Sequence, residues 1–332
     1  MPRTRRISSA KAQLPFGDAL SFCSIILRDK GTVNETHVRI DTDWITAFNG
    51  TFAIGCKFNS PLQACPHIKL VLEALAKCKD EIGIAFDGRL LIKSGKFKAS
   101  IPCVDFNLIE LSIPDPPQVD IDERLKIAFE TANLLKTDDG QTIYSASFLI
   151  NGQSLIASLS GQMIMEYWHG ISLPQGPSVP KSFANIISKI NKKPVKIGFS
   201  QWSMTIYFDD ESWIRTQLFA EQWPDIGHLF DIQTDLKPFP ADFWNALVAV
   251  SPFGEGMILA DGKTLRSLGQ NGASAEFQLE SHLGSWTYPA RQLALLQPWA
   301  SVVDFHAQSA HGHCLIAMGK NARAIIAGVR NA

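Results

Sequence analysis

The stretch PHIKLVLEALAKCKDEIGIAF, residues 66–86, joins a helix pattern to a strand pattern. Its apolar residues recur at the spacing of one helix face, and its leading proline suits a first helical turn. These apolar residues are Ile68, Leu72, Leu75 and Cys78. The run IGIAF favours a strand, and a turn leads into LLIKSGKFKASIP, residues 90–102, where apolar and basic residues alternate. This order predicts a helix followed by strands.

The same order returns twice along the chain. It recurs in PKSFANIISKINKKPVKIGFSQWSMTIYF, residues 180–208, which continues into SWIRTQLF. It recurs again in PARQLALLQPWASVVDF, residues 289–305, followed by CLIAMGK and ARAIIAGV. The three leading prolines are spaced at about 110 residues, a period that marks a repeated domain. The repetition therefore predicts one module used three times.

Each module also has matching segments upstream. WITAFNG at 44–50, LIASLSG at 155–161 and TLRSLGQ at 264–270 occupy equivalent places, and each follows a helix pattern. The helix patterns are FGDALSFCSIILRDKG, DERLKIAFETANLLKTDDG and ADFWNALVAVS. Proline-rich stretches at 113–120 and 236–242 separate the modules. We therefore expect an α+β protein of three similar domains at 14–115, 116–238 and 239–332, each built as helix, strands, helix, strands, after a basic flexible tail at 1–13.

Composition limits the function classes. The chain has 332 residues, 45% of them hydrophobic, and a formal net charge of -1, so no global basic field draws it to nucleic acid. No apolar run has the length of a membrane span, and the basic start MPRTRRISSAKAQ lacks the apolar core of a signal peptide. The start is expected to be a mobile tail, with contact to DNA as an alternative. The six cysteines show no metal or redox spacing, which is typical of reduced thiols in a cytosolic protein.

The sequence contains no arrangement that implies a reaction. It has no nucleophile elbow and no phosphate-binding loop. The cluster HGHC at 311–314 lacks a second set of ligands, and the acidic run Asp209, Asp210 and Glu211 is expected to be a solvated hairpin tip. We therefore expect no enzyme, no cofactor and no metal site, although catalytic groups can also assemble from distant residues.

Two short motifs add to the repeat. KFKASIPCVDF, residues 96–106, gives a basic strand followed by Ile-Pro and Asp-Phe, and IRTQLFAEQWPDI, residues 214–226, ends in Trp-Pro-Asp-Ile. With the threefold repeat, they resemble the bacterial DNA polymerase III beta subunit, the DNA sliding clamp, and its phage-encoded relatives. The family has proline at the place of Asn107 and tyrosine at the place of Ile226.

The resemblance implies a homodimeric ring of six domains, with helices inside and sheets outside. Such a ring encircles double-stranded DNA without reading its sequence, tethers the replicative polymerase, is opened by a clamp loader, and has no catalysis of its own. It works in the cytoplasm of a bacterial cell or phage-infected host. The alternative is a β-rich structural or interaction protein, such as a phage component, that keeps the fold without encircling DNA.

A DNA-facing wall needs cations for phosphates, which give a salt-dependent attraction independent of sequence. The candidates on the helices are Arg28, Lys30, Lys69, Lys77, Lys79, Lys181, Lys189, Lys192, Lys193 and Arg291. The ordinary alternative is that they are lysines and arginines on solvated helix faces. The first helix of the third module has no Lys or Arg, and its second has only Arg291. Either the positive lining is uneven, or the third domain serves mainly in closure and partner binding.

The family binds polymerase and clamp-loader peptides in an apolar pocket between domains two and three. Residues carried over to it are Leu159, Gly161, Met163, Ile164, Phe230, Ile326, Val329 and Arg330. The turn that precedes this wall lacks the histidine and arginine of the family. The peptide motif that this pocket binds can therefore differ from the motif that the family binds. Core packing is the alternative for the apolar members.

Ring closure implies that a strand of domain one joins a strand of domain three of another subunit, which also hides the exposed edges. The first strand carries Lys96, Phe97, Lys98, Ala99 and Ile101. The second carries Glu276, Phe277, Leu279 and Glu280, with the glutamates facing the lysines. A basic strand facing solvent within one subunit is the alternative.

Overall fold

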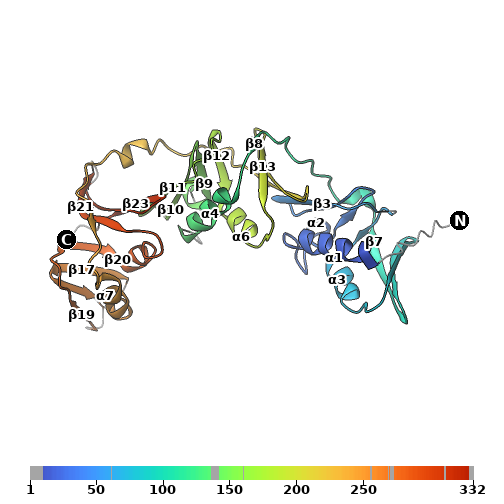
Figure 1. Cartoon of the computed structure of the whole chain (residues 1–332), viewed down its shortest axis with the longest axis horizontal. Helices are drawn as coiled ribbons and strands as arrows, with labels where there is room; N and C mark the ends of the chain where they lie inside the picture. The colour runs from blue at the N-terminus through green and yellow to red at the C-terminus, as the bar shows by residue number, and fades with distance from the viewer. Residues whose placement is uncertain are drawn as a thin grey trace. The chain divides into compact units, whose positions relative to one another are not determined.

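The computed structural model describes residues 10–60, 62–135, 142–159, 161–254, 256–267, 269, 273–309 and 312–328, with side chains from residue 16 onward. The chain divides into two compact units. The first takes Met1–Lys126 and Ser182–Leu218, and the second takes Ile127–Lys181 and Phe219–Ala332. Figure 1 shows helices and strands in both units.

The first unit contains a seven-stranded sheet of order β1-β2-β3-β15-β14-β13-β8 and a four-stranded sheet of order β4-β7-β6-β5. The strands of the larger sheet are β1 (Arg39–Ile40), β2 (Trp44–Phe48), β3 (Phe52–Lys57), β8 (Val119–Asp120), β13 (Pro194–Phe199), β14 (Ser203–Phe208) and β15 (Trp213–Gln217). Those of the smaller sheet are β4 (Cys65–Pro66), β5 (Ile82–Phe86), β6 (Arg89–Ser94) and β7 (Phe97–Val104). The helices are α1 (Ala10–Ser24), α2 (Val33–Thr36) and α3 (Ile68–Leu75), and a 3-10 turn, η1 (Phe106–Leu108), follows β7.

The second unit contains an eight-stranded sheet of order β12-β9-β10-β11-β23-β22-β21-β16 and a four-stranded sheet of order β19-β18-β17-β20. The first of these consists of β9 (Ser147–Asn151), β10 (Ser154–Leu159), β11 (Met163–Trp168), β12 (Gln175–Pro180), β16 (Lys237–Pro238), β21 (Val302–Ser309), β22 (Gly312–Met318) and β23 (Ala322–Ala327). The second consists of β17 (Met257–Gly262), β18 (Thr264–Ser267), β19 (Glu276–Gln278) and β20 (Gly284–Pro289). The helices are α5 (Ile143–Ala146), α7 (Phe243–Val250) and α8 (Ala290–Ala294), with 3-10 turns η2 (Asn133–Leu135), η3 (Gly227–Phe230) and η4 (Ser251–Phe253). The division into units falls within α4 (Glu123–Ala132) and at the start of α6 (Lys181–Ile187).

Each large sheet joins strands from two of the predicted domains. In the first unit β15 pairs antiparallel with β3, and Ile214 lies opposite Ile54. In the second unit β23 pairs antiparallel with β11, and Ile325 lies opposite Ile164. The sheets are therefore continuous across the junctions of the sequence repeat.

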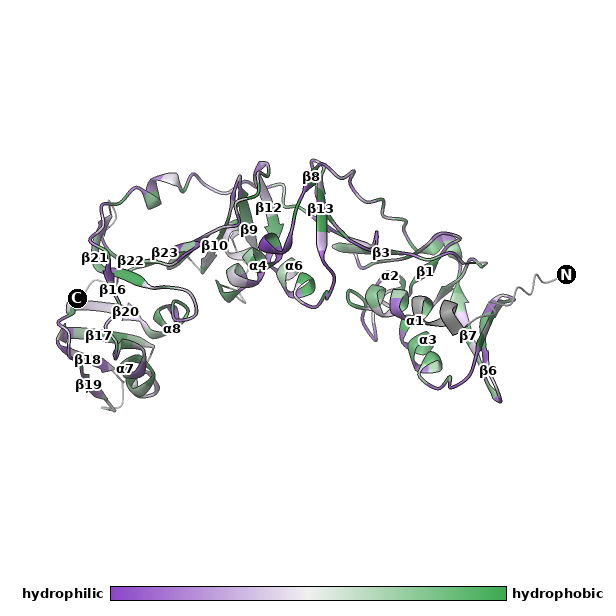
Figure 2. Ribbon diagram, in the orientation of Figure 1, coloured by the Kyte–Doolittle hydropathy of each residue, from purple (hydrophilic) through white to green (hydrophobic). Residues whose placement is uncertain are grey.

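Helices cover one face of the seven-stranded sheet, and a segment of the chain crosses the other face. On the first, the Phe22 ring of α1 meets Phe208 at 6.0 Å, and the Phe183 ring of α6 meets Phe52 at 6.4 Å. On the other, residues 106–118 run across the strands. A Cβ at Gly198 would lie 2.1 Å from the Pro116 carbonyl oxygen, so only glycine lets the chain cross so closely. The hydrophobic β22 in Figure 2 matches its run of buried residues in the second unit.

The repeated order of helices and strands agrees with the sequence pattern, apart from its prolines. Pro66 belongs to β4, Pro180 ends β12 and Pro289 ends β20, so each closes a strand just before a helix. Its fixed φ suits an extended strand end as well as a first helical turn. Helix α1 begins at Ala10, inside the stretch predicted as tail, and residues 1–9 lie outside the described residues. The three-domain division stays a prediction.

Candidate functional site

The first unit holds all the predicted phosphate-binding cations except Lys181 and Arg291. Of these only Lys69 lies within a helix, and the others follow the ends of α1, α3 and α6, so the expectation that they lie on the helices is wrong for them. We call these three helices and the segments that follow them the helical layer. Helices α1 and α3 lie on the same side of β3 (Figure 1). Two of the cations are paired with carboxylates, the exposed Arg28 with the half-buried Glu35 at 3.2 Å and Lys69 with the exposed Asp29 at 2.6 Å. Because such surface pairs are weak, both cations remain available to a phosphate.

Lys192 is held in place by the surrounding side chains. Its Nζ lies 2.5 Å from Asp210 Oδ2 and 3.8 Å from the centre of the Phe22 ring. Burial alone would raise the pKa of Asp210, but hydrogen bonds from Lys192 and Ser212 hold that pKa below its usual value. This pair keeps the acidic hairpin tip folded against the helical layer.

The other cations of this layer are exposed and form no ion pair with any described residue. They are Lys30, Lys77, Lys79, Lys189 and Lys193. Arg124 on α4, which sequence reasoning passed over, is also exposed and is paired with Asp122 at 2.9 Å. Arg124 could have been found from the sequence, because it is a basic residue within a segment that was predicted to be a helix.

Lys181 does not lie on an exposed surface, so its assignment to the DNA-facing set is wrong. The residue is 7% exposed, and its Nζ donates hydrogen bonds to the carbonyl oxygens of Leu135 and Ser158. The residue follows β12 directly, where the chain enters the core of the second unit. These buried carbonyl oxygens satisfy hydrogen bonds of the Lys181 ammonium group, which is therefore not available to a phosphate. Arg291 on α8 is exposed, as predicted.

The second unit has an apolar pocket of about 270 Å³ on the face of its large sheet opposite to α4. Gly161, Met163 and Ile164 line it, as predicted. Its other lining residues are Gln162, Leu229, Ile232, Ser309, His313, Cys314, Ile325, Ala327 and Gly328. Leu229 and Ile232 come from the linker between the second and third modules, and Ile325 comes from β23.

Three residues expected in the pocket lie beside it instead. Leu159 and Ile326 are buried, and the register places both directly opposite Met163, so these three side chains share the other face of the sheet and Met163 reaches the pocket only at the start of β11. Phe230 packs its ring 4.1 Å from the Arg323 guanidinium carbon, which anchors the linker. Val329 and Arg330 lie outside the described residues. For Leu159 and Ile326 the alternative of core packing therefore applies, because a strand exposes only every second side chain to a given face.

Strand β7 carries the predicted basic edge. Its only other neighbour, β4, pairs with Cys103 and Val104 alone, so residues 97–102 have a strand partner only on the β6 side. Lys96 and Lys98 are exposed, Phe97 and Ala99 are half-buried, and Ile101 is buried. This alternation of exposed lysines with less exposed apolar residues matches the pattern in the sequence.

Strand β19 is the edge of its four-stranded sheet. Glu276 and Glu280 are exposed, Phe277 is half-buried, and Leu279 is buried just after the strand. Glu276 already pairs with Arg266 at 3.0 Å. Two strand edges of opposite charge are therefore open in the described part of the chain.

Comparison of the fold with solved structures covers nearly the whole chain. The DNA polymerase III subunit beta from Pseudomonas aeruginosa superposes with a TM-score of 0.80 over 99% of this chain and 100% of that one, at 12% identity. The fold is that of the bacterial sliding clamp. The beta subunit of Streptococcus pyogenes DNA polymerase gives a TM-score of 0.77 at 13% identity, covering 96% and 99%. The Helicobacter pylori beta clamp bound to a DNA ligase peptide gives 0.76 at 12%, covering 96% and 99%.

The clamp fold is conserved here without detectable sequence similarity. No protein-family model and no curated protein matches the sequence. Among the described residues of this clamp fold, no three histidine, cysteine or acidic side chains gather as a metal site. A search of the same residues found no helix with the length and apolarity needed to cross a bilayer.

Proposed function

We propose that this protein is a DNA sliding clamp, a homodimeric ring that encircles duplex DNA and tethers a replicative polymerase, with no catalysis of its own. The observation that carries the proposal is the extent of the fold match, which takes in 99% of this chain and all of the P. aeruginosa subunit. A fold supports many functions, so the site features below supply the specific argument.

The repeat itself argues for ring closure. The last strand of the second module, β15, pairs with β3 of the first, and the last strand of the third, β23, pairs with β11 of the second. By the same rule β7, the last strand of the first module, should pair with β19 of the third. Among the described residues of one chain, neither edge has a second strand partner along residues 97–102 or along β19. A second copy with the same two edges would complete the pairing and close a ring.

Duplex DNA is the ligand that suits the helical layer. Exposed lysines without carboxylate partners, such as Lys77, Lys189 and Lys193, attract phosphates at any sequence. A ring holds DNA by topology, so a few such contacts are enough, and the formal net charge of -1 is compatible with the role. Arg28, Lys30, Lys69, Lys79, Lys192 and Arg291 stay in the proposed set, and Arg124 joins it.

The pocket of the second unit is the proposed docking site for polymerase and clamp-loader peptides. It has a volume of about 270 Å³ and mainly apolar walls, which suits two or three apolar side chains of a short motif. The H. pylori clamp, whose fold is similar, was solved with a DNA ligase peptide. His313 at the rim offers a polar contact that could set the partner motif.

A topological assay separates a clamp from a protein that merely binds DNA. The protein is incubated with linear duplex that carries biotin at both ends, streptavidin is added, and the mixture is gel-filtered in about 0.5 M salt, where phosphate contacts are screened. A clamp is retained only on the blocked duplex and is released when a restriction enzyme cuts it. Equal loss from blocked and open duplex would contradict encirclement and favour the interaction-protein alternative.

A further inference from the structure

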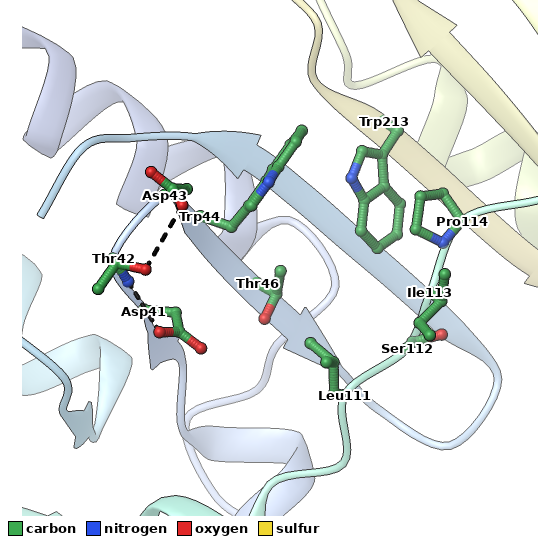
Figure 3. A pocket seen from close by; sticks show the side chains of 10 residues that line it. All are labelled: Asp41, Thr42, Asp43, Trp44, Thr46, Leu111, Ser112, Ile113, Pro114 and Trp213. Atoms are coloured by element: carbon green, nitrogen blue, oxygen red, sulfur yellow. Dashed lines mark hydrogen bonds between the residues drawn. The ribbon is translucent and has the colours of Figure 1, made fainter.

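The first unit holds a second apolar groove, on the face of its large sheet that the 106–118 segment crosses. The groove has a volume of about 330 Å³ and lies between β2, the start of β15 and residues 111–114 (Figure 3). All its lining residues belong to the first unit, so it is separate from the pocket proposed for the polymerase peptide.

The walls of the groove are aromatic and aliphatic. Trp44 and Trp213 lie with ring centres 6.5 Å apart, and Trp213 packs so close to β3 that a Cβ at Gly55 would be 2.4 Å from its ring. On the opposite wall Leu111 is 57% exposed and Ile113 is 73% exposed. Exposed aliphatic residues facing an indole pair form an apolar patch that a partner can cover.

The wall at 111–114 is fixed in advance. On one side Asp115 accepts hydrogen bonds from Ser203 Oγ at 2.7 Å and Thr205 Oγ1 at 2.8 Å. Arg215 donates to Ser112 Oγ at 3.0 Å. On the other side Arg39 donates to the carbonyl oxygens of Phe106 and Ile109 at 3.2 Å. Since both ends of this wall are anchored before a ligand binds, binding costs little conformational entropy in residues 111–114.

The backbone of this wall is open. The N–H and C=O groups of residues 111–113 make no hydrogen bond with any described residue. An extended peptide laid along the wall can pair with these groups as an added strand and place its side chains between the two walls. This feature favours a peptide over a compact small molecule.

The charge at the mouth is negative. Asp41 and Asp43 line the groove, and none of its lining residues is basic. Three cations lie near the groove, and each pairs with a carboxylate other than Asp43. Arg39 pairs with Asp41 at 3.6 Å, Arg215 with Asp115 at 3.6 Å and Lys57 with Glu211 at 2.5 Å. The Asp43 carboxylate is exposed, and among the described residues it accepts only the 3.5 Å hydrogen bond from Thr42 Oγ1 drawn in Figure 3 and forms no ion pair. The mouth therefore repels phosphates and attracts a lysine or arginine.

We propose that this groove docks an extended peptide of a partner protein that carries bulky aliphatic residues beside lysine or arginine. The groove would give the clamp a second site for partner peptides. This site would differ from the polymerase pocket in its place and in the charge of the peptide that it binds. Asp43 would bind the cation, and the indoles with Ile113 would enclose the aliphatic pair.

The test uses the full chain labelled with 5-fluorotryptophan and the capped peptides Ac-GKKILG-NH2 and Ac-GEEILG-NH2. The eight tryptophan signals are assigned with single Trp→Phe variants. The basic peptide should shift the fluorine signals of Trp44 and Trp213 saturably, and the acidic peptide should bind at least about tenfold more weakly. Absence of these shifts up to about 5 mM, or equal binding of both peptides, would overturn the proposal.

Matched variants localise the effect. Asp43→Lys and Ile113→Asp change exposed side chains and should each weaken the basic peptide by about tenfold, whereas Asp87→Lys, an exposed control on the β5–β6 turn, should leave it unchanged. A shift of Trp223 alone, whose apolar cluster includes the pocket residue Ile164, would assign the peptide to the other pocket and contradict the proposal. Shifts that appear only after deletion of residues 2–9 would assign the groove to the chain's own basic segment and would likewise overturn it. An unchanged solution mass of both variants keeps this result independent of ring closure.

Discussion

Lysines in the helical layers serve two different purposes, and burial separates them. Lys189 and Lys193 are exposed and suit phosphates, whereas Lys181 is buried and satisfies two carbonyl groups. From the sequence all three belong to one basic cluster. The spacing of charges along a helix does not reveal which lysine enters the core, since that depends on the strand that precedes it.

Replacing Lys181 should therefore affect stability rather than DNA binding. Lys181→Met removes the donor for the carbonyl groups of Leu135 and Ser158, so we expect the free energy of unfolding to fall by about 2 kcal/mol. Denaturant titration measures this. The control Lys189→Met should stay within about 0.5 kcal/mol. Equal effects of the two substitutions would show that Lys181 is not buried.

His37 gives the fold a dependence on pH. Burial, and then the neighbouring His67, lower the pKa of His37 from its ordinary value of 6.5. A histidine whose pKa is lowered in the folded state favours folding while it is neutral, so stability is present above about pH 6.5 and is lost as the pH falls below it. The Tm should drop between pH 7.5 and 5.5, and His37→Gln should flatten that drop. An identical pH profile in the variant would contradict this role.

At the scale of elements, the sequence pattern predicted the order of helices and strands within a module. It did not predict to which face of a sheet each side chain points. The period of apolar residues located the longer helices and several strands of each module, because each element buries one face, whereas strands such as β9, β12 and β20 were not predicted. It could not decide whether Leu159 or its neighbour faces the pocket, because a one-residue change in parity exchanges the two faces of a strand. The aromatic groove was missed because its parts, Trp44, Ile113 and Trp213, are far apart in the sequence.

The edge strand β7 should control dimer formation. Reversing the charge of Lys96 and Lys98 together places glutamates opposite Glu276 and Glu280 in the proposed pairing, and we expect the dimer dissociation constant to rise at least about tenfold. Lys320→Glu is the control, since Lys320 is exposed on the turn between β22 and β23 and lies on neither edge strand. Sedimentation over a dilution series measures the effect. Equal behaviour of the variant and the control would place the interface elsewhere.

At the scale of the molecule, the repeat is the most informative feature. Three modules provide three last strands, and the chain pairs two of them internally, β15 with β3 and β23 with β11. In the proposed ring the third pair, β7 and β19, would form with another copy. The pairing rule follows from the strand order alone, which agrees with a clamp fold at only 12% identity. The identity of the partner proteins, by contrast, depends on side chains in the two pockets that no repeat can predict.

The mass in solution tests the central claim most directly. Light scattering across a concentration series should give twice the chain mass of 36.6 kDa, and the dimer should persist on dilution, because ring closure uses both open edges of each copy. A strict monomer would mean that the fold is kept without ring closure. A trimer would give nine domains instead of six, and either result would contradict the proposed two-subunit clamp.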